Sequence, residues 1–274
     1  MQRPTGPSAF TLIEALVVIA MIALMAALLF PVISKGRTNA ATAYDLNNNK
    51  QILVAMQMYA GDNDDFLPQP GWGSDVACWA SGAGMPPGGE PYTASHYNDV
   101  VDKQVASFHG GQLYSYLKNP SLLKCPSDDV IDAFYLRRRV YICSYVWNAA
   151  ILGFPTKPPE GRFPKTFKLR EFKPDAFLEW EADEMRPFCF DDFSNYPDEG
   201  ISKRHGTTAT IGRFDGGAQR LALDEFLADS GTVAPDFEHS GTGWRKSLIP
   251  APNRLWCSPQ NRGVPPATAT IGGP

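Results

Sequence analysis

The sequence predicts an α+β protein in which a long N-terminal helix is followed by a globular head with an antiparallel sheet. Two patterns lead to this fold class. Residues 10–61 have helical spacing, and the first half of this stretch is almost wholly apolar. Short β-branched and aromatic runs follow after residue 137 and are separated by segments rich in Gly and Pro.

Composition limits the classes of function. The formal charge is −4, and the only tight cluster of basic residues is 137–139, so no nucleic-acid partner is expected. The 24 Gly and 24 Pro residues predict a head rich in loops. Five cysteines without a C-x-x-C pair argue against a disulfide scaffold and a zinc ribbon.

The first half of the helix carries no charge from Ala15 to Ile33. At about 1.5 Å per residue this run spans close to the ~30 Å hydrocarbon core of a bilayer. A cleaved secretory signal is the alternative, and residues 41–43 offer an A-x-A pattern, but the apolar run is longer than such signals need. Basic residues flank both ends, so the positive-inside rule does not fix the orientation.

The second half of the helix, residues 34–61, follows Pro31, which lacks an N–H and is expected to kink the helix. Gly61 suits a C-terminal cap. The predicted apolar stripe of this half should lie against a sheet and consists of Leu46, Leu53, Met56 and Ala60.

The head begins with residues 62–95, which read as loop because Gly, Pro, Asp and Ser dominate them. Strands are expected within 138–152 and 176–183. The second of these alternates, which predicts one face with Leu178, Trp180 and Ala182 and an opposite face with Glu179, Glu181 and Asp183. Residues 207–214 and 218–226 flank Asp215-Gly216-Gly217, a hairpin turn.

Residues 9–33, "AFTLIEALVVIAMIALMAALLFPVI", resemble the N-terminus of type IV prepilins and type II secretion pseudopilins. The resemblance implies a leader of residues 1–9, cleavage between Ala9 and Phe10 by a prepilin peptidase, and N-methylation of Phe10. Glu14 and Pro31 then become the fifth and twenty-second residues, as in that family. Ala9 departs from the family's usual Gly. The implied fold is pilin-like, with a transmembrane half at 10–33, a soluble half at 34–61 and a head at 62–274.

Glu14 is the one carboxylate in this apolar stretch. A carboxylate within the bilayer costs roughly 2.5–3.5 kcal/mol on insertion scales. The resemblance implies a role that offsets this cost: Glu14 of one subunit pairs with the new α-amino group of a neighbour during assembly. The alternative is that Glu14 only reaches the membrane interface.

A second stretch, "RHGTTATIGRFDGG", places nine residues between His205 and Asp215-Gly216. It is similar to the H-X9-DG region, here 205–216, of large pilin-like proteins from Planctomycetes and Verrucomicrobia. The segments "LKCPSD" and "SYVWN" also resemble the middle of those proteins; they contain Cys125, Pro126, Asp128, Tyr145 and Asn148.

Several residues are candidates for a site in the head. His205 and Asp215 could face each other across the hairpin and, without a recognisable nucleophile nearby, are interpreted as a structural pair beside Gly216; a metal or acid–base site is the alternative. No cofactor or metal is expected apart from Ca²⁺, because major pseudopilins bind it in a C-terminal loop. The calcium candidates, which could equally form a charged surface loop, are Asp183, Glu184, Asp191 and Asp192.

The cysteines and tryptophans allow more than one interpretation. Cys125 and Cys143 are the candidate disulfide, because disulfides persist beyond the membrane. The six scattered tryptophans would indicate sugar binding if exposed and an ordinary core if buried.

These observations predict a non-enzymatic structural subunit of a type II secretion pseudopilus or a type IV pilus-like filament. Its expected partners are further copies, other pilin-like subunits, the prepilin peptidase and the inner membrane, with the head in the periplasm before assembly into a pseudopilus or cell-surface filament. The alternatives are a membrane-anchored binding module, for example for polysaccharide, and a tethered metal-dependent hydrolase using His205 and nearby acids.

Overall fold

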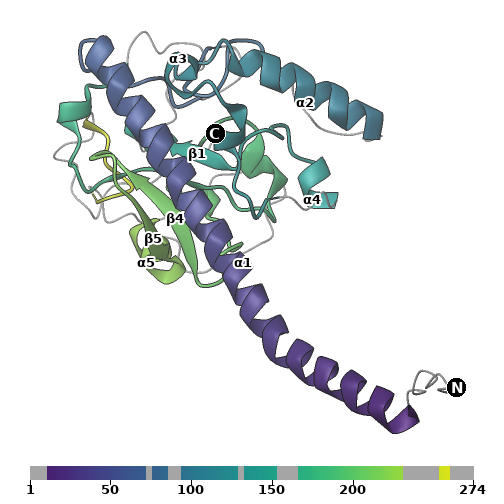
Figure 1. Cartoon of the computed structure of the whole chain (residues 1–274). Coiled ribbons are helices and arrows are strands. Elements are labelled where there is room, and N and C mark those ends of the chain that lie inside the picture. Colours follow the sequence, from purple (N-terminus) through teal and green to yellow (C-terminus); the bar gives the residue numbers. More distant parts are fainter. Residues whose placement is uncertain are drawn as a thin grey trace, which may run out of the picture. The chain divides into compact units, whose positions relative to one another are not determined.

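The computed structural model describes residues 11–71, 76–85, 94–128, 133–152, 166–230 and 253–259 (Figure 1). Contacts between residues divide the chain into two compact units, residues 1–41 and 42–274. Helix α1 (Leu12–Asp62) contributes to both units.

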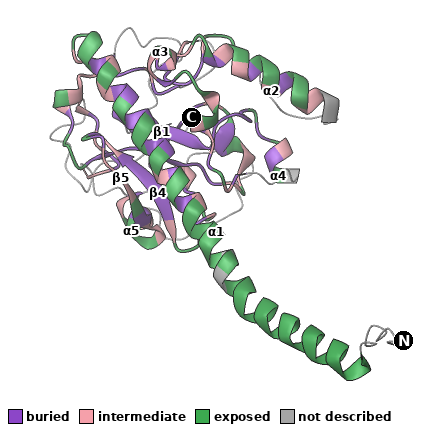
Figure 2. Cartoon of the chain, viewed as in Figure 1, coloured by how far each residue is buried: buried purple, intermediate pink, exposed green. Residues whose placement is uncertain are grey.

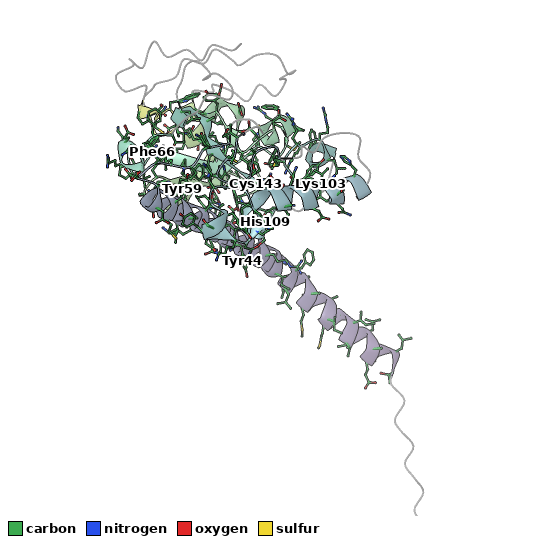
Figure 3. All side chains as sticks on the ribbon, turned by 90° about the horizontal axis from the view of Figure 1, so that it is seen from above. Tyr44, Tyr59, Phe66, Lys103, His109 and Cys143 are labelled. Carbon is green, nitrogen blue, oxygen red and sulfur yellow. The ribbon has the colours of Figure 1, made fainter. Side chains whose placement is uncertain are left out.

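The part of α1 in the first unit is exposed, and its described residues between Ala15 and Ile33 are apolar on every side (Figures 2 and 3). Leu16, Ile22 and Leu28 point in different directions around the helix, and each is more than half exposed. The helix continues through Pro31. Its apolar window is long enough to cross a membrane and, unlike a core helix, is not buried at all. The expectation of one helix able to span a membrane is confirmed.

The part of α1 in the second unit packs against the head. Leu53, Met56 and Ala60 are buried as the stripe predicts, whereas Leu46 is only half-buried. The helix includes Gly61 and ends at Asp62, so Gly61 is not its cap. The acidic turn beyond closes the helix, because Asp64 and Asp65 have φ of 53° and 72° and the Asp65 N–H donates to the Ala60 carbonyl.

The head contains a five-stranded sheet in the order β3-β1-β2-β4-β5. The strands are β1 (Tyr145–Asn148), β2 (Phe177–Glu181), β3 (Ser194–Asn195), β4 (Thr208–Arg213) and β5 (Ala218–Ala222). Most pairs are antiparallel, but β3 runs parallel to β1. The α+β class is therefore confirmed, and the prediction of a purely antiparallel sheet is wrong. The chain forms β2 on one edge of β1 before it returns to the other edge as β3, and such a return can give a parallel pair.

The hairpin at Asp215-Gly216 forms as the turn signal predicts. It joins β4 to β5, with Thr208 opposite Ala222 and Gly212 opposite Ala218. The strand expected to reach residue 226 stops at Ala222, where helix α5 (Leu223–Ser230) begins.

All five residues of β2 are buried, on the acidic face of the strand as well as on the apolar face. On one face, Trp180 packs against Phe226 of α5, with ring centroids 5.3 Å apart. On the other face, Glu179 lies opposite Gly212 of β4, where a Cβ would be 2.9 Å from Leu53 of α1. Helix α1 therefore covers the face that carries Glu179 and Glu181, and it buries both carboxyl groups.

The rest of the head surrounds this sheet. Its helices are α2 (Ala94–Phe108), α3 (Tyr114–Leu117) and α4 (Ala133–Leu136), with 3₁₀ turns η1 (Pro120–Leu123), η2 (Ala149–Leu152), η3 (Leu169–Glu171), η4 (Pro187–Phe190) and η5 (Pro197–Glu199). Trp79 stacks on Trp147 at 5.0 Å between ring centroids. The four tryptophans within the described residues belong to the core; Trp72 and Trp244 lie outside those residues.

Candidate functional site

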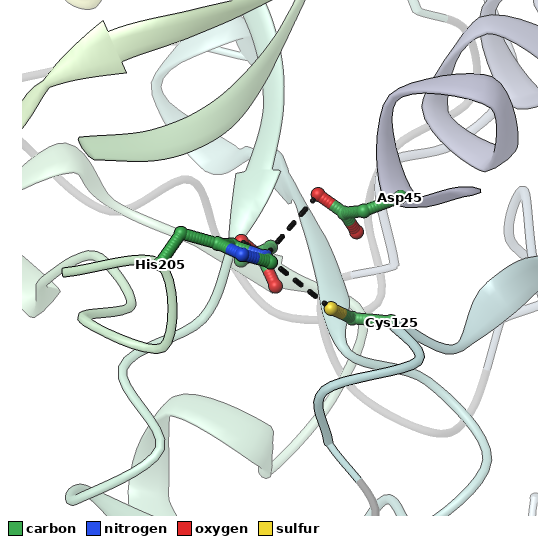
Figure 4. A group of neighbouring side chains, drawn as sticks. Asp45, Cys125 and His205 are labelled. Carbon is green, nitrogen blue, oxygen red and sulfur yellow. Dashed lines mark hydrogen bonds and ion pairs between the residues drawn. The ribbon is translucent and has the colours of Figure 1, made fainter. Parts of the chain in front are cut away.

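Four polar side chains that could ligate a metal meet inside the head. They come from four segments of the second unit, and we call them the buried cluster: Asp45, Cys125, Glu181 and His205. Figure 4 labels Asp45, Cys125 and His205. Their potential ligand atoms all lie within 4.8 Å of one another, and all four residues are buried.

Local structure explains how each residue of the buried cluster is placed. Asp45 lies two helical turns before Ile52 on the buried face of α1. Glu181 ends β2 on the face that α1 covers. His205 occupies the turn that precedes β4. Cys125 follows η1, and its backbone N–H donates to Ser144 Oγ.

The three other members of the buried cluster converge on one nitrogen of His205. From Nε2, the distances are 3.2 Å to Glu181 Oε2, 3.5 Å to Cys125 Sγ and 3.6 Å to Asp45 Oδ2. The other ring nitrogen, Nδ1, faces the Thr42 hydroxyl at 3.4 Å. A nucleophilic relay needs the nucleophile and the carboxylate on different ring nitrogens. This arrangement therefore does not form a Cys-His-Asp triad.

Neighbouring groups hold the outer atoms of the two carboxylates. Tyr145 donates its hydroxyl to Asp45 Oδ1 at 2.6 Å, and Arg204 donates to Glu181 Oε1 at 3.3 Å. The inner oxygens, Asp45 Oδ2 and Glu181 Oε2, are buried and both face His205 Nε2, whose single N–H can serve only one of them. A buried carboxylate oxygen without a partner carries a large desolvation cost.

An ion-pair network supports one side of the buried cluster. Arg204 also contacts Asp128 Oδ1 at 3.1 Å, and Arg138 contacts both oxygens of Asp128. Ser144 donates its hydroxyl to Asp128 Oδ2 at 2.7 Å. These side chains are buried, so the network fixes the position of Arg204 against Glu181.

Burial and neighbouring charges shift the pKa values in this cluster. Burial, followed by the Glu181 carboxylate, raises the pKa of Asp45 to about 6. Burial also raises the pKa of the Cys125 thiol, and Glu181 and Asp45 add to the effect. Burial opposes ionisation of Glu181, but His205 and Arg204 outweigh it and lower its pKa. The hydrogen bond to Glu181 raises the pKa of His205 despite burial.

A groove of about 370 Å³ borders the buried cluster. Cys125 and Asp128 line it, so the groove leads from the surface to the cysteine side of the cluster. Its remaining lining residues are Tyr44, Asn48, Ser121, Lys124 and Pro126.

The predicted pairing of His205 with Asp215 is wrong. The two residues flank opposite ends of β4, whose six residues span about 20 Å, so they cannot meet across the hairpin. Asp215 instead contacts Arg213 at 2.8 Å and accepts a hydrogen bond from the Gly217 N–H. Gly216 occupies the turn with φ of 80°.

The candidate disulfide between Cys125 and Cys143 is also corrected, because all five cysteines are free. Cys143 Sγ donates to the Tyr145 carbonyl at 3.1 Å, whereas Cys125 Sγ faces His205. The two thiols therefore have different partners.

The four calcium candidates do not converge. Asp183 contacts Arg186, Glu184 accepts from the Lys203 N–H, and Asp192 accepts from Ser194. Asp191 is exposed. Within the described part of the chain, the buried cluster is the one group of three or more His, Cys, Asp or Glu side chains with metal-ligand proximity.

The processing motif is described only in part. Ala9 and Phe10 lie outside the described residues. Glu14 Oε2 accepts hydrogen bonds from the N–H and hydroxyl of Thr11, both at 2.8 Å, and the Glu14 N–H donates to the Thr11 hydroxyl. This reciprocal arrangement is a capping box at the start of α1. Pro31 is exposed within the helix.

Sequence reasoning missed Asp45 and the inward orientation of Glu181. Their positions could have indicated their burial: Asp45 falls on the helical face of Asn49 and Ile52, and Glu181 ends an apolar strand.

Comparison with protein-family models, curated proteins and solved structures matched none of them to this chain.

Proposed function

We propose that the chain is a pilin-like structural subunit. In this proposal, α1 anchors it in the inner membrane with the head in the periplasm. After removal of residues 1–9 by a prepilin peptidase, it joins further copies and other pilin-like subunits in a type II pseudopilus or a type IV pilus-like filament. The observation that carries the proposal is α1 itself, one continuous helix whose first half is exposed and apolar all round.

An apolar surface of this extent needs a cover in the cell. A bilayer covers it before assembly, and neighbouring α1 helices replace the lipid in a filament. A secretory signal fits less well, because the A-x-A pattern at 41–43 lies inside α1. Cleavage after residue 43 would cut a continuous helix and remove Thr42, which contacts His205.

The described residues favour neither alternative function. Their four tryptophans are buried, so they do not form an aromatic surface for polysaccharide. The four members of the buried cluster turn their inner atoms toward one another within the core, and of these four only Cys125 lines the groove.

Substitution of Glu14 tests the proposal and separates two roles for this residue. Glu14→Leu removes both the charge and the capping box, whereas Glu14→Gln removes the charge and can retain the capping hydrogen bonds. We expect membrane insertion of both variants to equal or exceed that of the wild type, because the cost of the buried charge is gone. We expect filament yield to fall in both.

The measurements are carbonate extraction for insertion and chemical cross-linking of sheared filaments for assembly. N-terminal sequencing of the extracted protein checks for a mature chain that begins at Phe10. Normal assembly of Glu14→Gln with loss in Glu14→Leu would assign Glu14 to capping alone. A mature chain that begins after residue 43 would overturn the proposed function.

A further inference from the structure

We propose that the buried cluster is a closed, structural site for one divalent transition-metal ion, with Zn²⁺ the best match. Asp45 Oδ2, Cys125 Sγ, Glu181 Oε2 and His205 Nε2 would be its four ligands. This inference concerns the head alone and does not rest on the proposed filament function.

Convergence on His205 Nε2 is the first support. A proton on this nitrogen can form one good hydrogen bond, yet three acceptor or thiol groups lie within 3.6 Å of it. A metal ion at the centre satisfies all four groups at once. With bonds of about 2.0–2.3 Å, a tetrahedral site has ligand–ligand distances of roughly 3.3–3.7 Å. The distances of 3.5 and 3.6 Å from His205 Nε2 fall in this range, the distance of 3.2 Å lies just below it, and all pairs of ligand atoms lie within 4.8 Å.

The two inward-facing carboxylate oxygens are the second support. Asp45 Oδ2 and Glu181 Oε2 are buried and both face His205 Nε2, whose single N–H can serve only one of them. Both residues have no solvent exposure, so water does not solvate the second negative charge. Coordination would satisfy both oxygens at once.

Outer contacts orient the proposed ligands, as they do in known metal sites. Tyr145 holds the outer oxygen of Asp45, and Arg204 holds that of Glu181. Thr42 faces Nδ1 of His205, which leaves Nε2 for the ion. The Ser127 N–H donates to the Cys125 sulfur at 3.4 Å. Each proposed ligand therefore has a second contact that orients its side chain, and its ligating atom points into the buried cluster.

The donor set selects the class of metal. One thiolate, one imidazole and two carboxylates suit Zn²⁺ and related first-row ions better than Ca²⁺ or Mg²⁺, which prefer oxygen ligands alone. Four protein ligands fill a tetrahedral sphere, and catalytic zinc sites usually keep one position for water. The site is therefore structural: it joins α1, the segment after η1, β2 and the turn before β4. On binding, the Cys125 thiol proton leaves to solvent, and the proton on His205 Nε2 leaves too, so that a neutral imidazole with its N–H at Nδ1, facing Thr42, coordinates the ion. The groove beside Cys125 provides access.

Metal content of the detergent-extracted full chain, prepared without a polyhistidine tag, tests the site. We expect one Zn²⁺ per chain by elemental analysis. Replacement with Co²⁺ should give the visible bands of a tetrahedral site and a thiolate charge-transfer band. Cys125→Ser should abolish the charge-transfer band and weaken Zn²⁺ binding at least tenfold.

Cys143→Ser is the matched control, because Cys143 is equally buried but hydrogen-bonds to a carbonyl away from the ion. It should retain the ion and both spectral features. A chelator should lower the melting temperature of the wild type and of Cys143→Ser, and should have little effect on Cys125→Ser. This chelator comparison on the wild type remains informative if Cys125→Ser does not fold.

Two results would overturn the inference. The first is a wild-type chain that binds no Zn²⁺ or Co²⁺ and melts identically with chelator, which would make the buried cluster a hydrogen-bonded His–carboxylate group. The second is equal metal binding in Cys125→Ser with no change in the cobalt spectrum, which would place the ion elsewhere, for example at the surface residues His96 or His109.

Discussion

Gly216 shows how a single residue in the hairpin depends on the helix that covers it. Its φ of 80° lies in the left-handed region, and a Cβ there would be 2.7 Å from the Gln57 side chain of α1. Its carbonyl also accepts a hydrogen bond from Lys50 of the same helix. Both the backbone conformation and the packing therefore favour glycine at this position.

Gly216→Ala should destabilise the head by about 1–2 kcal/mol from its backbone conformation, with a further cost from the contact with Gln57. Gly84→Ala is the control, because Gly84 has φ of 75° and nothing within 4 Å of its Cβ position. Chemical denaturation of both variants measures the difference. Adding Gln57→Ala should reduce the excess cost at Gly216. Equal losses in Gly216→Ala and Gly84→Ala would show that the contact is unimportant.

At the residue scale, the sequence predicts some members of the buried cluster but not their partners. His205 and Cys125 both stand out in the sequence, yet the spacing around the turn pairs His205 with Asp215, and the expected location beyond the membrane pairs Cys125 with Cys143. Their real partners are distant in sequence: Asp45 precedes His205 by 160 positions in the numbering. Local spacing predicts contacts within a helix or a hairpin, and it holds no information on which helix covers which face of a sheet.

At the element scale, the close approach of α1 to β4 depends on Gly212. A Cβ on Gly212 would be 2.9 Å from Leu53 Cδ1 and 3.2 Å from the Glu179 Cβ. Leu53 is fully buried, and it has little room to move away. The alternation in β2 predicts the two faces of the strand correctly but not the burial of its acidic face, because that burial comes from α1.

Gly212→Ala should destabilise the head by about 1–3 kcal/mol through overpacking between α1 and β4. Leu53→Ala should cost about 2–5 kcal/mol through the cavity it leaves. The double variant should cost less than the sum, because each change relieves the other. Gly61→Ala, a helical position with nothing within 4 Å, should instead stabilise the head slightly. Strict additivity in urea denaturation would contradict the packing account.

At the scale of the whole molecule, the amphipathic and apolar halves of α1 correspond to the two compact units. The apolar half could be predicted from the sequence because an uncharged run of membrane-spanning length is typical of a transmembrane helix. The sheet order could not, since the short strands β1 and β3 lie next to each other only through long-range pairing. The boundary between residues 41 and 42 falls directly before Thr42, which contacts His205 of the buried cluster.

Two truncations test whether the second unit folds alone. A chain of residues 42–274 keeps Thr42 and Asp45, and it should be soluble without detergent and as stable to urea as the full chain. A chain of residues 47–274 loses both side chains, which leaves Tyr145 and His205 with buried polar groups that have lost a partner. It should lose several kcal/mol, at roughly 1–3 kcal/mol for each such group. Detergent-phase partitioning and urea denaturation measure the two properties. Aggregation of 42–274 without detergent, or equal stability of the two truncations, would show that the division of α1 at this boundary does not describe how the protein folds.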